Sequence, residues 1–135
     1  MFKNKFFLIV LFISQSLFSQ IFDPVKWTFK IDSINQNEVE FIANALIDDG
    51  WYTYSQFLPE GGPVPTSFSF NKSQDYDLIG DVVEEKLDQK YDPNFRMNLK
   101  LFKKSTSFRQ RIKLNKYSES KLKGYLEFMA CNDVM

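Results

Sequence analysis

Apolar residues alternate with polar ones along most of this chain, and this period of two constrains the fold more than any other feature. The pattern runs over residues 25–31 and resumes over residues 39–45, after a turn signal at residues 35–37. Successive side chains of a strand point to opposite faces, so alternation marks a strand with one face in a core. The sequence therefore predicts antiparallel sheets packed face to face.

The remaining strands are predicted from the same alternation or from β-rich aromatic runs, over residues 51–57, 67–70, 97–101, 108–114 and 122–128. Seven or eight short strands spaced roughly 10 residues apart are typical of an all-β sandwich. Residues 81–89 are the one segment for which a short helix is an alternative. Trp27 and Phe29 share a strand face, so both are predicted to lie in the core. Loops are predicted at the proline- and glycine-rich residues 58–66 and at residues 91–95.

Residues 1–19 have the layout of a secretory signal peptide, with basic Lys3 and Lys5 before an unbroken apolar run over residues 6–13. The run is too short to span a bilayer, which needs about 20 residues. A membrane-tethering helix is the alternative. Removal of the signal peptide leaves residues 20–135, a length typical of one domain. Without Lys3 and Lys5, 15 basic residues remain against 17 acidic ones, so the charge of −2 gives no basic surplus for nucleic acid or an anionic membrane.

The absence of histidine and the presence of a single cysteine exclude several classes of site. Without histidine, Ser-His-Asp and Cys-His nucleophilic sites cannot form. The same two facts rule out the usual zinc and iron–sulfur ligand sets, so no metal is predicted. Gly61 and Gly62 precede Pro63, which blocks the helix that a phosphate-binding loop needs.

Cys131 is the one cysteine of a chain predicted to be exported, where cysteines usually come in pairs. It is an intermolecular link, a reactive thiol or half of a pair; a buried structural cysteine is the alternative. Alternation along the last predicted strand places Cys131 in phase with Lys123 and Glu127 rather than with Leu126 and Phe128. This phase predicts a solvent-accessible thiol on the outer face of the sheet.

Four segments, in this order, resemble the N-terminal periplasmic domain of the thiol:disulfide interchange protein DsbD. They are DDGWYTYSQF (residues 48–57), Pro65-Thr66, YDPNF (residues 91–95) and GYLEFMAC (residues 124–131). The resemblance implies an immunoglobulin-like β-sandwich in the periplasm, in a protein-disulfide reductase family associated with cytochrome c biogenesis. It implies thiol–disulfide exchange without a bound cofactor. Electrons would pass from a membrane-embedded reductase domain to thioredoxin-like and other periplasmic oxidoreductases.

The resemblance also assigns roles to individual residues. Cys131 matches the first of two redox cysteines, and the second is expected five or six residues later, so residues 20–135 are expected to form a domain truncated at its C-terminal end. Phe95 matches an aromatic residue on a cap loop that shields the cysteines, and Asp92 matches an acidic residue beside it. The wall of the site is matched by Trp51, Tyr52 and Tyr54. From the residues alone, Phe95 could be a packing anchor, and Tyr52 and Tyr54 could be ordinary core or edge residues.

A second function fits the same composition. An exported, noncatalytic β-sandwich could bind a protein or a glycan through the aromatic residues at 51–57 and 91–95. In that case Cys131 would have no redox role.

Overall fold

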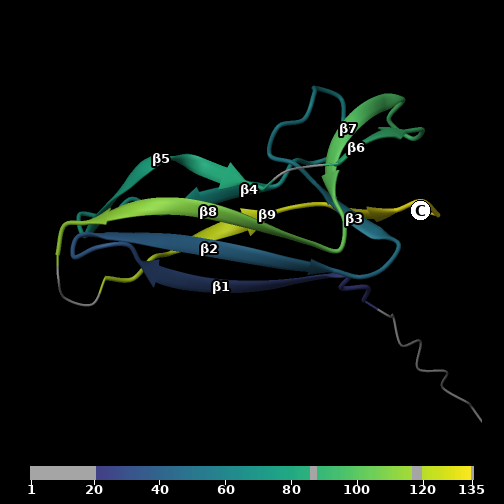
Figure 1. Ribbon diagram of the computed structural model, residues 1–135. Coiled ribbons are helices and arrows are strands. Elements are labelled where there is room, and N and C mark those ends of the chain that lie inside the picture. The colour runs from purple at the N-terminus through teal and green to yellow at the C-terminus, as the bar shows by residue number, and fades with distance from the viewer. Residues whose placement is uncertain (1–20, 86–87, 117–119, 135) are drawn as a thin grey trace, which may run out of the picture.

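The computed structural model describes residues 21–85, 88–116 and 120–134, and all regular structure in these ranges is β (Figure 1). The predicted signal peptide at residues 1–19 lies outside the described residues. The short helix considered for residues 81–89 is wrong, because residues 81–84 and 88–89 belong to two strands. No helix in the described ranges has the length and apolar character needed to cross a membrane.

Three antiparallel sheets build two layers. The long sheet has the strand order β1-β2-β8-β5, the short sheet has the order β10-β3-β7-β6, and β4 pairs with β9 in a two-stranded ribbon. Packed together they form an immunoglobulin-like β-sandwich, as predicted. The strands are β1 (Val25–Ser33), β2 (Glu38–Ile47), β3 (Trp51–Tyr54), β4 (Ser67–Phe70), β5 (Tyr76–Glu84), β6 (Asp88–Asp92), β7 (Met97–Phe102), β8 (Ser105–Leu114), β9 (Gly124–Glu127) and β10 (Ala130–Asn132).

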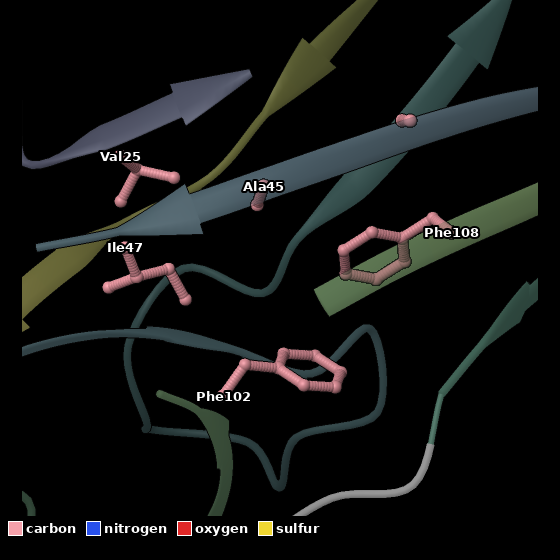
Figure 2. Close-up of a cluster of buried hydrophobic side chains, with 6 residues drawn as sticks. Val25, Ala45, Ile47, Phe102 and Phe108 are labelled. Carbon is pink, nitrogen blue, oxygen red and sulfur yellow. The ribbon is translucent and has the colours of Figure 1, made fainter. Parts of the chain in front are cut away.

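The main core lies between the long sheet and the other two sheets. Its fully buried centre is aliphatic on β1 and β2 and aromatic on β7 and β8, and Figure 2 shows this arrangement. Phe68 of the ribbon and Trp27 of β1 are half-buried and pack against this centre. The buried residues of this cluster are Val25, Ala43, Ala45, Ile47, Phe102 and Phe108.

The two aromatic residues predicted to be core on β1 differ in burial. Trp27 is half-buried and its ring contacts those of Phe68, Phe108 and Phe128. The prediction is wrong for Phe29, which is 56% exposed and stacks on Phe41. The reason is the position of β1 at the edge of the long sheet, where residues beyond Trp27 extend past the main core. Alternation therefore predicts the face of a residue correctly but not how far along a strand the core reaches.

Candidate functional site

A second apolar cluster covers the face of the short sheet that points away from the main core. Tyr52 and Tyr54 lie two apart on β3 and share this face, where their rings meet edge to face at 5.7 Å. Cys131 is directly opposite Tyr52 in the β3–β10 pair, and Leu101 is opposite Tyr54 in the β3–β7 pair. Both tyrosines are buried together with Leu99 and Leu101. The cysteine thus lies beside the rings of Tyr52 and Tyr54.

Cys131 has the phase that the sequence predicts, but its face is partly covered. Met129 and Cys131 pack on the second cluster, whereas Phe128 and Ala130 pack on the main core. The Thr53 hydroxyl donates a hydrogen bond of 2.9 Å to the carbonyl oxygen of Met129. This bond fixes the chain where β9 ends and β10 begins. The thiol is consequently half-buried rather than fully exposed.

The hairpin formed by β6 and β7 stands at the same end of the molecule as the C-terminus (Figure 1). Tyr91 and Asp92 belong to β6, so the turn predicted for residues 91–95 in fact spans residues 93–96. Arg96 closes this turn in the left-handed region, with φ of 54°. Phe95 projects from the turn and is half-buried against the cluster of Tyr52, Tyr54 and Cys131.

Asp92 links this turn to Tyr54 on β3. Its side chain is only 3% exposed, although carboxylates are rarely buried unless they have hydrogen-bond partners. One carboxylate oxygen accepts hydrogen bonds from the backbone N–H groups of Asn94 and Phe95, at 2.8 and 3.3 Å. The other accepts one from the Tyr54 hydroxyl at 3.3 Å. The same residue therefore shapes the turn that carries Phe95 and ties it to β3.

Electrostatics keep the two tyrosines of the site protonated. Burial is the main cause that raises the pKa of Tyr54 far above its usual value, and hydrogen bonding with the Cys131 side chain raises it further. Burial also raises the pKa of Tyr52, assisted by the charge of Asp92 and opposed by the ammonium of Lys90. The arrangement is a carboxylate, a phenol and a thiol in sequence, with the phenol in the middle.

Lys90 and Asp133 complete the surroundings of the thiol. Lys90 Nζ forms an ion pair with the Asp133 carboxylate and lies 5.1 Å from the centre of the Tyr52 ring. The hydrogen bond between them raises the pKa of Lys90 and lowers that of Asp133. Lys90 lies two residues before Asp92 on β6, so both side chains face the site. This spacing could have placed Lys90 at the site from the sequence alone, but only if residues 88–92 had been recognised as a strand.

The structure gathers five of the six residues that the resemblance assigned to the site, namely Cys131, Tyr52, Tyr54, Asp92 and Phe95. Trp51 is not among them. It follows the opposite phase of β3, packs against the main core and lies 6.0 Å from the ring of Phe22. In the described ranges, no three cysteine, aspartate or glutamate side chains gather where they could hold a metal ion.

Comparison with known proteins places the chain in a family. The family model of the N-terminal region of the thiol:disulfide interchange protein DsbD matches residues 19–135. No curated protein matches the sequence significantly. The crystal structure of the N-terminal periplasmic domain of ScsB from Proteus mirabilis has a similar fold, with a TM-score of 0.61 and 19% identity. That match covers 84% of this chain and 42% of the ScsB chain. Because the family model covers the whole described domain, the chain belongs to the family of DsbD N-terminal domains.

Proposed function

We propose that this domain performs thiol–disulfide exchange in the periplasm, with Cys131 as one of two redox sulfurs. It relays electrons from a membrane-embedded reductase domain to thioredoxin-like and other periplasmic oxidoreductases, without a bound cofactor. The observation that carries the proposal is the placement of the one cysteine. Cys131 is half-buried beside Tyr54, Asp92 and Phe95, outside the main core where a merely structural cysteine would be expected.

The proposed reaction has two steps. The Cys131 thiolate attacks a disulfide of the partner, which forms a mixed disulfide and releases one partner thiolate. The second sulfur of the pair then attacks the Cys131 sulfur, which forms a disulfide in this domain and releases the other partner thiolate. Two electrons pass to the partner. These 135 residues contain one cysteine, so the second sulfur of the proposed reaction is not among them.

In this reaction the Tyr54 hydroxyl can form a hydrogen bond with Cys131 in both its thiol and its thiolate form. A tyrosine hydroxyl donates one hydrogen bond and accepts others. While Tyr54 donates to Asp92, its oxygen is free to accept a hydrogen bond from the thiol. When Cys131 ionises, the same hydroxyl hydrogen can turn toward the sulfur. Because the pKa of Tyr54 is raised, the phenol keeps its proton in either state.

The alternative of a noncatalytic binding module has less support. Its binding surface would consist of the aromatic residues at 51–57 and 91–95, yet most of these are packed into one of the two clusters. Only Phe57 and Tyr91 are exposed, at 62% and 56%.

The cap assignment predicts that Phe95→Ala will speed alkylation of Cys131. The half-buried ring packs against the same cluster as Cys131, so we expect its removal to make the thiol more accessible. If the free energy needed to expose the thiol falls by about 1.4 kcal/mol, the reaction becomes about tenfold faster. Stability should fall by less than about 1.5 kcal/mol, because a half-buried ring at a turn removes less area from water than a core ring does. The measurement is the rate of reaction with iodoacetamide, together with a urea unfolding curve.

Tyr91→Ala is the matched control, since it removes an aromatic ring from the same hairpin but from the exposed side. It should leave the alkylation rate unchanged. Equal rates in Phe95→Ala and the parent protein, or a large loss of stability in Phe95→Ala, would make Phe95 a packing anchor instead of a cap.

A further inference from the structure

We propose that Lys90 and Asp133 form an electrostatic clasp that holds the β6–β7 hairpin closed over Cys131, and that this clasp opens when a partner protein reaches the sulfur. The inference rests on the proposed function and adds to it a positioning role for two residues. Neither residue would take part in the exchange itself.

The first argument is topological. β6 and β10 are the two edge strands of the short sheet, with β3 and β7 between them. Neighbouring strands lie about 4.8 Å apart, so in a flat sheet the two edges would be separated by about 14 Å. Lys90 of β6 nevertheless contacts Asp133, which follows directly after β10. The registers also separate the two residues along the strands, since Lys90 pairs with Leu99, two residues from the Leu101–Tyr54 pair, whereas Asp133 follows the Asn132–Trp51 pair. The sheet is therefore curled, and the ion pair joins its two edges across the face that carries the cysteine.

The second argument is where the lysine side chain passes. Its ammonium lies 5.1 Å from the centre of the Tyr52 ring, within the range of a cation–π contact. Tyr52 is the residue directly opposite Cys131. Lys90 therefore crosses the sheet beside the thiol, and a partner that approaches Cys131 along this face meets its side chain.

The third argument is how the two edges are held. In the part of the chain that the structure describes, β6 pairs with β7, and the three-residue β10 pairs with β3. Within the described ranges, the Asp92–Tyr54 hydrogen bond ties the hairpin to β3, whereas the Lys90–Asp133 pair ties it to the segment that bears the sulfur. The ion pair therefore adds a side-chain link between the hairpin and this segment to the apolar packing of Phe95 and Cys131 on the second cluster.

The exposure of the pair suits a clasp that opens. The side chain of Lys90 is 32% exposed and that of Asp133 is 68% exposed. Ion pairs at such positions are weak and are screened by salt. Lysine and aspartate are charged near neutral pH, and the ion pair favours their charged forms further, because it raises the pKa of Lys90 and lowers that of Asp133.

The test measures the rate at which Cys131 reacts with iodoacetamide, a neutral reagent, in Lys90→Met, Asp133→Asn, and a charge-exchanged double variant, Lys90→Asp with Asp133→Lys. We expect each single variant to react about two- to fivefold faster, as for the loss of a partly exposed ion pair. The double variant should return toward the parent rate. High salt should accelerate the parent protein but not the single variants. Lys116→Met is the control, since it removes an ion pair with Asp75 that lies beside the long sheet, just before β5 and just after β8.

Two further readouts separate access to the thiol from its ionisation. The pH profile of the rate gives the fraction of thiolate independently of the limiting rate. Hydrogen exchange at residues 88–97 reports hairpin opening directly, and it should be faster in both single variants. Unchanged limiting rates and unchanged exchange, or a double variant no closer to the parent than the single ones, would overturn the clasp.

The clasp and the proposed function fail in different ways. If the clasp is wrong, Cys131 still forms a mixed disulfide with a thioredoxin-like protein, and the ion-pair variants leave its alkylation unchanged. If the redox function is wrong, no mixed disulfide forms, whereas the variants still alter access to the thiol.

Discussion

Phe108→Ala will lower the free energy of unfolding by about 3–5 kcal/mol, the usual cost of removing a fully buried aromatic ring. The ring of Phe108 has no exposed surface. It lies 5.1 Å from the ring of Phe68 on β4, 5.4 Å from that of Phe102 on β7 and 5.8 Å from that of Trp27 on β1. One side chain of the long sheet thus contacts all three sheets, so a cavity at this position cannot be filled by a shift of a single strand. Urea unfolding measures the change.

Phe29→Ala is the corresponding control. It removes the same ring from a position that is 56% exposed and stacked on Phe41, so the loss should stay below about 1.5 kcal/mol. Similar losses in the two variants would contradict the placement of the core.

Asp92→Ala will have the largest combined effect on stability and on the site. It removes the acceptor of three hydrogen bonds, to Tyr54, Asn94 and Phe95, and leaves the buried Tyr54 hydroxyl without its acceptor. Net hydrogen bonds contribute about 0.5–1.5 kcal/mol each, and an unsatisfied buried group adds about 1–3 kcal/mol. We expect a loss of about 2–4 kcal/mol. Because the turn that holds Phe95 is released, alkylation of Cys131 should also accelerate beyond the rate of Phe95→Ala.

Two variants isolate the cause of this effect. Asp92→Asn keeps a carbonyl oxygen for the backbone N–H groups of the turn, so it should lose less stability than Asp92→Ala and keep the cap in place. Asp88→Ala removes an exposed carboxylate from the same strand and should change neither property. An Asp92→Ala protein as stable as the parent would show that the buried carboxylate does not hold the turn.

The strands that alternation predicted are those with one face in a core. β1, β2 and β7 follow the rule, since their inward side chains are mostly apolar. On β8, Phe108 and Ile112 follow it, although the polar Thr106 and Gln110 are buried on the same face. Alternation did not predict β5, because the register of β5 on β8 shifts between Ile79 and Val83, where Gly80 has a φ of 67°. The bulge changes the phase of the alternation within the strand. Alternation did not predict β6 either, because two of its inward side chains, Lys90 and Asp92, are charged. Both strands thus break the pattern for a physical reason.

The site was predictable to a similar extent. Resemblance to the family brought together Cys131, Tyr52, Tyr54, Asp92 and Phe95, which the structure places in one cluster with its adjoining hydrogen bond. It also included Trp51, which points to the opposite face, as neighbouring residues of a strand must. The contact between Lys90 and Asp133 could not be predicted from the sequence, because it depends on the curl of the short sheet rather than on spacing along the chain.

The most direct measurement of the redox role is the capture of a mixed disulfide. The reduced protein is mixed with a thioredoxin-like oxidoreductase in which the second cysteine of its CxxC motif is replaced and the first is activated as a mixed disulfide with thionitrobenzoate. Under native conditions we expect rapid release of thionitrobenzoate and a covalent one-to-one complex through Cys131, which Cys131→Ser abolishes. Should Cys131 stay unreactive until the protein is denatured, it would be an inert structural thiol, and the redox function would be contradicted.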